Sequence, residues 1–395
     1  MPQLSRKTAR AAVLGAAGLA LFAAGSLVLR PHTAPATNSF EADGAILQTG
    51  FGHLALARPA TYANLTVYPV YSNQSKSTAA QAAEFVTLAE GMDRGSLRAS
   101  EENNGSAPGM GAAYTVPSGT SIPEESVTNA DEGQEHRNAN VMLVTNVAPK
   151  PTYIPDGQVV PGGGQDRGAA ADTIVPARSA EVQVPAYCVE AERSRGQSPD
   201  FRKSMTIAIP SVRYAMQVTG EQQPVWNAVA QATSHFNAHT QSGTYAALAS
   251  APAAQAATLP YATALTVPVQ SGTPGRVIGV VAAINGHIVC ADLYRDPALF
   301  AQMWPSLLRS YALQAAMSRP HRPSAPLRDA EAAHWLAALD TAPGTPSRAC
   351  DLSCAARVRN VDGAGVRVAA ISASGGSRLS LLHEAFWTPA AVLTN

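Results

Sequence analysis

Residues 279–313 read GVVAAINGHIVCADLYRDPALFAQMWPSLLRSYAL, and this stretch decides the fold. Two β-rich runs, 277–284 and 287–294, flank the dipeptide Asn285-Gly286. Asn-Gly between two apolar runs is the strongest short signal for a hairpin, because both residues tolerate the positive φ angles of a type I′ turn. The sequence therefore predicts an antiparallel β-hairpin.

A helix is predicted directly after this hairpin. Asp296 can cap it, and Pro297 suits its first position because proline has no backbone N–H to leave unsatisfied. The apolar residues that follow recur at helical spacing and form one face: Leu299, Phe300, Met303, Trp304, Leu307, Leu308 and Tyr311. Pro305 interrupts the backbone hydrogen bonding, so we expect it to kink the helix or divide it in two.

Short strand-like runs, turns and helical segments alternate along the rest of the chain. Apolar patterns favour strands at 64–70, 141–145, 172–176, 181–190 and 205–209, and a second hairpin at 365–372 and 378–383. A helix is predicted from Ser77 or Thr78 to about Met92. We therefore expect an α+β fold, mostly antiparallel β-hairpins packed with a few helices, as a single domain after an N-terminal membrane helix.

The N-terminus has the pattern of a membrane-targeting segment. Arg6, Lys7 and Arg10 precede an uncharged, mostly apolar run at 11–29. A helix of that length reaches across a bilayer core of about 30 Å. The length favours an uncleaved anchor, whereas 34–36 (Ala-Pro-Ala) offers a cleavage pattern of small residues. Residues 1–30 are thus a signal anchor or a signal peptide, and 31–50 are predicted to be a linker.

Either route of export places the chain after residue 50 outside the cytoplasm, because the positive flank stays inside. The protein is expected to be anchored in the membrane through residues 11–29, or else secreted or periplasmic. The 28 basic and 28 acidic residues cancel, so no nucleic-acid partner is expected. Residues 103–137 are dense in Gly, Ser, Asn, Pro and Glu, which predicts a mobile insertion.

Export would also let the four cysteines pair. Cys188 and Cys290 lie in strand-like runs and can meet across a sheet, and a bridge between Cys350 and Cys354 would close a small loop. Four cysteines allow three connectivities, of which the pairing 188/290 with 350/354 is preferred.

Common motifs for metals, phosphates and acyl transfer are incomplete. His235 and His239 have a zinc-site spacing, but no third ligand is evident nearby, so no metal and no cofactor is predicted. The glycine-rich 162–167 (GGGQDR) lacks the Lys-Ser/Thr of a phosphate loop and taken alone is a turn. The chain contains no Gly-x-Ser-x-Gly for a serine nucleophile.

Cys188 and Glu190 are two residues apart on a predicted strand and would share one face. A neighbouring carboxylate raises the pKa of a thiol, so Cys188 needs a cationic neighbour to act as a nucleophile. Arg167 or Arg193 could supply that charge. A disulfide and a plain buried thiol are the alternatives.

Several segments together resemble the ARPP domain family, named for its association with ADP-ribosylglycohydrolases and rhodanese-phosphatase proteins. The matching stretches are NLTVYPVYS at 64–72, DGQVVPGGGQDR at 156–167, IVPARSAEVQVPAYCVEAER at 174–193, the stretch 279–313 quoted above and, more weakly, SLLHEAF at 380–386. They span nearly the whole chain after the linker. The resemblance therefore implies one ARPP-like α+β domain at 51–392.

This chain departs from the family pattern at charged positions. Residues that fit it are Asp156, Gly157, Gly162, Gln165, Arg167, Cys188, Val189, Glu190 and Arg193. Gln158 and Val159 stand where the family carries two glutamates, Gly164 where a basic residue is usual, and Asp166 in place of Asn. These losses lean against an enzymatic role for this member.

Three functions follow as hypotheses. The leading one is a ligand-binding or partner-binding domain that uses Gln165, Asp166, Arg167, Glu190 and Arg193. The second is a hydrolase or thiol-dependent enzyme linked to ADP-ribose or phosphate metabolism, with Asp156, Cys188 and Glu190 as catalytic candidates. The third is a structural envelope protein in which these residues merely pair with one another. The leading hypothesis predicts that 162–167 and 188–193 converge on one polar site.

Overall fold

The hairpin at 277–294 forms as the Asn-Gly signal predicts. Strands β14 (Val277–Ile284) and β15 (His287–Tyr294) pair antiparallel with Ile284 opposite His287, and a register shift between Ala282 and Ala283 marks a bulge. Asn285 and Gly286 have φ angles of 55° and 81°, as a primed turn requires. Every residue of β14 is buried, so this hairpin lies in the core of its sheet.

The structure is a computed structural model. It describes residues 39–42, 45–48, 54–72, 85–101, 141–193, 198–270, 277–319, 327–341, 355–361, 365–373 and 379–388. The predicted targeting segment 11–29, the insertion 103–137, Cys350 and Cys354 lie outside these residues. Among the described helices, none has both the length and the apolar character needed to span a membrane. The described residues all belong to one compact unit, 35–395.

The larger sheet has ten described strands, in the order β1-β2-β18-β15-β14-β5-β3, with β4 on β5 and the pair β16 and β17 on β18. The pair β2 and β18 is parallel and the others are antiparallel. The remaining strands are β1 (Ser39–Ala42), β2 (Ala45–Gln48), β3 (Leu54–Leu56), β4 (Ala60–Tyr62), β5 (Leu65–Ser72), β16 (Ala355–Val361), β17 (Gly365–Ala373) and β18 (Leu379–Trp387).

Two of the predictions made from the sequence concern strands of this sheet. The second hairpin is confirmed, since β17 and β18 pair antiparallel. The predicted linker 31–50 includes β1 and β2, which pair with each other. The two strands, SFEA and AILQ, have four residues each. Composition alone cannot distinguish such short strands from a linker.

Two smaller sheets carry the middle of the chain. One has the order β10-β11-β13-β8-β7 and the other β12-β9-β6. Their strands are β6 (Val86–Thr87), β7 (Leu97–Ser100), β8 (Val141–Asn146), β9 (Thr152–Ile154), β10 (Val159–Val160), β11 (Arg167–Ala169), β12 (Thr173–Val175) and β13 (Ser179–Cys188). Helix α1 (Leu88–Asp93) follows β6. The helix predicted from Ser77 or Thr78 to about Met92 is confirmed only at its C-terminal end, where Thr87 caps α1. Val86 belongs to strand β6 instead, and 77–84 lie outside the described residues.

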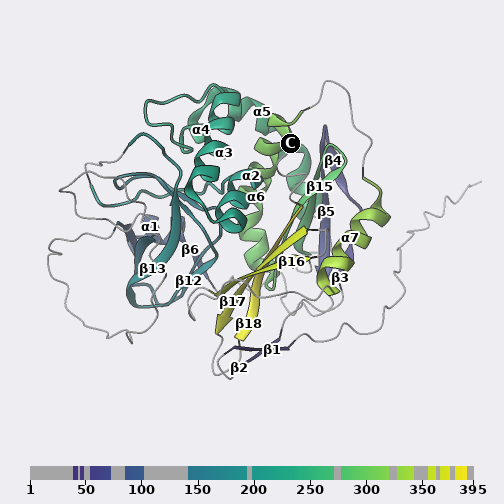
Figure 1. Cartoon of the computed structure of the whole chain (residues 1–395). Helices are drawn as coiled ribbons and strands as arrows, with labels where there is room; N and C mark the ends of the chain where they lie inside the picture. The colour runs from purple at the N-terminus through teal and green to yellow at the C-terminus, as the bar shows by residue number, and fades with distance from the viewer. Residues whose placement is uncertain are drawn as a thin grey trace, which may run out of the picture. The chain divides into compact units, whose positions relative to one another are not determined.

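The helices between and after these strands bury apolar faces. They are α2 (Pro210–Tyr214), which continues into the π-helical turn η1 (Ala215–Thr219), α3 (Gln222–His235), α4 (Ala247–Ser250), α5 (Pro252–Gln270), α6 (Pro297–Met317) and α7 (Asp329–Thr341) (Figure 1). Asp296 caps α6 through Ala298 N at 2.8 Å, as predicted. One helix runs through Pro305, so the chain is not divided there.

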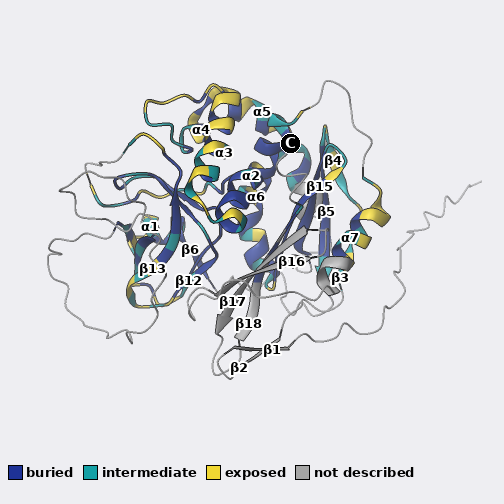
Figure 2. Cartoon of the chain, in the orientation of Figure 1, coloured by how far each residue is buried: buried dark blue, intermediate teal, exposed yellow. Residues whose placement is uncertain are grey.

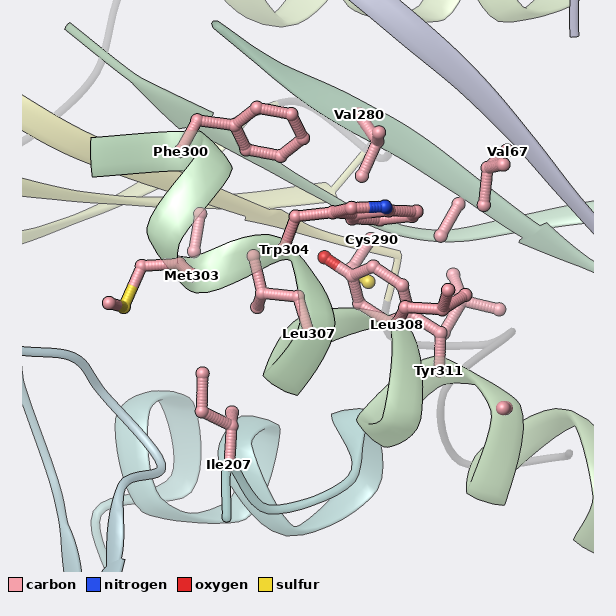
Figure 3. Packing of buried hydrophobic residues seen from close by; sticks show 14 of the residues in the cluster. Val67, Ile207, Val280, Cys290, Phe300, Met303, Trp304, Leu307, Leu308 and Tyr311 are labelled. Atoms are coloured by element: carbon pink, nitrogen blue, oxygen red, sulfur yellow. The ribbon is translucent and has the colours of Figure 1, made fainter. Parts of the chain in front are cut away.

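Helix α6 supplies much of the core of the larger sheet. Its face packs on β14 and β15, and Trp304, Leu307 and Tyr311 have no exposed surface. Figure 3 shows these side chains against Val67, Val280 and Cys290 from the strands. In Figure 2 the buried residues follow this helix and the strands beneath it. The observed fold is α+β and its strand pairs are mostly antiparallel, as predicted. The pairs β2 with β18 and β6 with β9 are parallel.

Candidate functional site

The structure brings 162–167 and 188–193 together. Arg167 lies opposite Cys188 in the β11–β13 pair, and Val189 N donates to Asp166 O at 2.9 Å. Gln165 Nε2 donates to Glu190 O at 3.1 Å. We call Gln165, Asp166, Arg167, Glu190 and Arg193 the glycine-loop site.

Strand β13 ends at Cys188, so Glu190 and Arg193 lie beyond it and can turn to the same side. Arg193 joins the two segments: its Nε donates to Glu190 Oε2 at 2.9 Å, and its Nη2 pairs with Asp166 Oδ1 at 3.0 Å. Its Nη1 also donates to Gly163 O at 2.7 Å. Burial alone would raise the pKa of Glu190, but the hydrogen bonds, first among them that of Arg193, outweigh burial and lower it.

Backbone N–H groups of the loop are held by buried carboxylates. Gly162 N donates to Asp166 Oδ1 at 2.7 Å, Gly164 N to Glu101 Oε2 at 2.8 Å, and Asp166 N to Glu190 Oε2 at 2.9 Å. Gly163 has a φ of 59°, and an added Cβ would lie 2.8 Å from Glu101 Cδ. Three hydrogen bonds therefore hold the loop, and the packing at Gly163 requires glycine.

Arg167 lies inside the protein and pairs with Glu101. Its Nη2 is 3.1 Å from Glu101 Oε1, and its Nη1 contacts Cys188 Sγ. Burial raises the pKa of the Cys188 thiol, and the opposing effect of Arg167 is smaller. Cys188 is thus a protonated, buried thiol at neutral pH, which is the opposite of what a nucleophilic cysteine needs.

Exposure divides the glycine-loop site into two layers. Asp166, Arg167 and Glu190 are 3%, 4% and 2% exposed. Gln165 and Arg193 are partly exposed. Together with Glu101 the site holds three carboxylates and two guanidinium groups, so negative charge is in excess.

Asp156, the other catalytic candidate, belongs to a different cluster. Its carboxylate accepts from Arg213 Nε at 2.7 Å and from Nη2 at 2.8 Å. Arg213 also donates to both oxygens of Asp292, at 3.1 and 2.6 Å. All three side chains are completely buried. The structure therefore separates Asp156 from Cys188 and Glu190, since its described partners are Arg213, Asp172 and His383.

His383 completes this second cluster, which we call the Arg213 network: Asp156, Asp172, Arg213, Asp292 and His383. Nδ1 of His383 is 2.8 Å from Asp172 Oδ2, and Nε2 is 3.2 Å from Asp292 Oδ1. Burial would lower the pKa of His383, but Asp172 and then Asp292 outweigh it and raise the pKa to about 10. His383 is therefore an imidazolium that donates from both ring nitrogens.

The carboxylates of the network differ in their pKa. Burial raises the pKa of Asp156 despite Arg213. For Asp172 the effect of burial is overcome by His383, and its pKa is lowered. For Asp292 the effect of burial is overcome by Arg213 and His383, so the pKa of Asp292 is also lowered. Tyr153 donates a hydrogen bond to Asp172, and Tyr311 donates one to Asp292. The network holds three carboxylates but only two cations, Arg213 and His383. Asp156 is the carboxyl group whose neutral form is favoured by burial.

One oxygen or nitrogen atom each of Asp156, Asp172 and His383 lies within 4.8 Å of the others, a separation that can hold a metal ion. A metal there would have to displace the proton of His383 and would lie beside the guanidinium of Arg213. At neutral pH the chemistry of the set therefore favours its own ion pairs. His235 and His239 are both exposed.

The predicted bridge between Cys188 and Cys290 is wrong, because both are buried free thiols. Cys188 ends β13 beside Arg167, whereas Cys290 lies in β15 under α6 (Figure 3). The two strands belong to different sheets. Strand composition indicated burial correctly but carries no information about which sheet each strand joins.

Sequence reasoning missed most of the Arg213 network and Glu101. Asp292 gave a usable signal, since it is a single charge inside the apolar run VCADLY. His383 stood in the weakly matching SLLHEAF segment. Arg213 and Asp172 are likewise single charges in mostly apolar runs, 205–218 and 168–177, whereas Glu101 lies in a polar run. Only the fold shows which of these charges meet.

Comparison with curated proteins and with solved structures gives no match. The family model for the ARG and Rhodanese-Phosphatase-superfamily-associated Protein domain matches residues 53–386, which is most of the chain. The match includes both segments of the glycine-loop site and all five residues of the Arg213 network. The chain therefore belongs to the ARG and Rhodanese-Phosphatase-superfamily-associated Protein domain family.

Proposed function

We propose that this protein is a binding domain whose ligand contacts Gln165 and Arg193 of the glycine-loop site. The observation that carries the proposal is the layering of the site. Asp166, Arg167 and Glu190 are buried and paired, and they hold in place a loop whose outer side chains remain partly exposed. A polar surface fixed in advance loses little conformational entropy when it binds.

The charges of the site indicate the class of ligand. The loop N–H groups, which would otherwise suit an anion, already donate to Asp166, Glu101 and Glu190. Carboxylates also outnumber guanidinium groups. A neutral or cationic polar group is therefore favoured over a phosphate.

We also propose that this domain works outside the cytoplasm, tethered to the membrane or secreted. Support comes from the apolar run 11–29 and its basic flank, Arg6, Lys7 and Arg10. The two free thiols do not argue against export, since each is buried where oxidants reach it poorly.

A thermal-shift screen tests the binding proposal. Neutral and cationic polar compounds, with ADP-ribose and inorganic phosphate as anionic comparators, are added to the wild type and to Gln165→Ala. Gln223→Ala is the matched control, because Gln223 is a glutamine on α3 outside the site. We expect neutral or cationic hits that stabilise the wild type and the control but not Gln165→Ala. Hits that all persist in Gln165→Ala would mean that binding occurs elsewhere on the protein and would refute this site. No hit at all would favour the structural envelope protein.

A hydrolase remains the second candidate, on the strength of the Arg213 network. Fully buried groups with shifted pKa values, such as Asp156 and His383, are typical of active sites as well as of structural ion pairs. A hydrolase would release product from ADP-ribosyl or phosphoryl test substrates, and Asp156→Asn would abolish that release. The thiol-dependent version is disfavoured because burial raises the pKa of Cys188.

A further inference from the structure

A surface groove of about 550 Å³ has a lining distinct from both polar clusters. It is lined by residues at either end of α1, by the turn after β8 and by Gln302 of α6. None of its lining residues belongs to the glycine-loop site or to the Arg213 network. Its volume falls within the roughly 300–1,000 Å³ of small-molecule sites.

The groove combines an apolar surface with two cations. Phe85, Val86 and Ala148 are buried against it, and Val147 is 57% exposed. Arg94 and Lys150 line the same groove and are both exposed. Within the described part of the chain, no ion-pair partner is found for either side chain.

The carboxylate of Glu90 does not cancel these charges. Its Oε2 accepts from Thr87 N at 3.1 Å in the capping box of α1 and from Gln302 Nε2 at 3.0 Å. Two donors thus hold it at the start of the helix. Even with Glu90 fully ionised, one positive charge remains in excess among the lining residues.

The amide of Gln302 provides a third kind of contact. Its Nε2 is used by Glu90, whereas its Oε1 is buried without a hydrogen-bond partner among the described residues. A buried acceptor in this condition destabilises the protein until a donor reaches it. A hydrogen-bond donor on a molecule in the groove would supply that contact after a small rotation of the amide.

We propose that this groove binds a small organic anion. Its carboxylate or phosphate group lies between Arg94 and Lys150, its apolar part lies on Phe85, Val147 and Ala148, and a donor group points to Gln302 Oε1. The apolar part of the lining distinguishes such a molecule from an inorganic ion, which would leave that surface in water. The excess positive charge distinguishes it from a neutral apolar compound.

Isothermal titration calorimetry with the full-length protein tests this proposal. The probes are 1-naphthyl phosphate and 1-naphthoate, which separate the two anionic groups, together with the uncharged 1-naphthalenemethanol and inorganic phosphate. The variants are Arg94→Gln, Lys150→Gln and the double variant. Arg202→Gln is the control, because it removes the same charge from an exposed residue outside the groove.

We expect at least one naphthyl anion to bind more tightly than the alcohol and than inorganic phosphate. Each single variant should weaken that binding about fivefold and the double variant roughly twentyfold, since each removes one charge-assisted contact at a partly exposed site. Arg202→Gln should bind like the wild type. No measurable binding of either anion, equal binding of the alcohol, or a double variant with wild-type affinity would each overturn the proposal.

Discussion

Arg213 shows how a single residue can join parts of the chain that are far apart in sequence. Its guanidinium makes four hydrogen bonds, two to Asp156 and two to Asp292, and its Cζ lies 4.9 Å from the ring centroid of Trp387. These partners come from the small-sheet region and from the larger sheet. Because an unpaired buried charge costs several kcal/mol, each partner restricts where the others can lie.

His383 gives this network a pH dependence that can be measured. Its pKa is raised from 6.5 to about 10, so folding stabilises the protonated form. That contribution is complete below about pH 6.5 and is lost as the pH rises towards 10. We predict that the free energy of unfolding falls between pH 6.5 and 8.5, approaching about 1.4 kcal/mol per pH unit.

Urea denaturation at several pH values measures this slope. His235→Gln is the comparison variant, because it replaces an exposed histidine outside the Arg213 network. A free energy of unfolding that stays constant from pH 7 to 8.5 would mean that His383 is neutral in the folded protein.

At the scale of elements, the pairing of β14 with β15 depends on Gly279. A Cβ added there would lie 2.0 Å from Asp292 O and 2.8 Å from Leu293 Cα. These are backbone atoms of the neighbouring strand, so they cannot move without shifting Asp292 and the Arg213 network. We predict that Gly279→Ala lowers the free energy of unfolding by about 3 kcal/mol or more.

Gly243→Ala is the comparison for this substitution. Gly243 has a φ of 65° but nothing within 4 Å of an added Cβ. It should therefore cost only the backbone strain of about 1 kcal/mol. Equal losses in the two variants, measured by denaturant unfolding, would show that the strands separate easily at Gly279.

How much the sequence predicts depends on whether the cause is local. The hairpin at Asn285-Gly286 and the cap at Asp296 were predictable because each rests on residues next to one another. The convergence of Gln165 with Glu190 was also predicted, but through the family resemblance. The free state of Cys188 and Cys290 was not predictable, because the assignment of strands to sheets depends on long-range contacts.

For the whole molecule, we predict that the chain after residue 50 lies outside the cytoplasm. A phosphatase reporter that is active only after export, fused after residue 50, should be active. Replacing Leu19, Leu21 and Phe22 by Asp should abolish that activity, because charges in the apolar run prevent insertion. A cytoplasmic reporter active at the same fusion point would contradict the prediction.

The central claim is that the glycine-loop site has a buried layer that holds it and an outer layer that binds. The most direct measurement compares the free energies of unfolding of Arg167→Ala and Gln165→Ala. Arg167→Ala should lower the free energy of unfolding by about 3 kcal/mol or more, because it removes one member of the buried ion pair between Arg167 and Glu101. Gln165→Ala should lose less than about 1 kcal/mol, since Gln165 is partly exposed. Similar losses in the two variants, or an Arg167→Ala protein as stable as the wild type, would contradict the account.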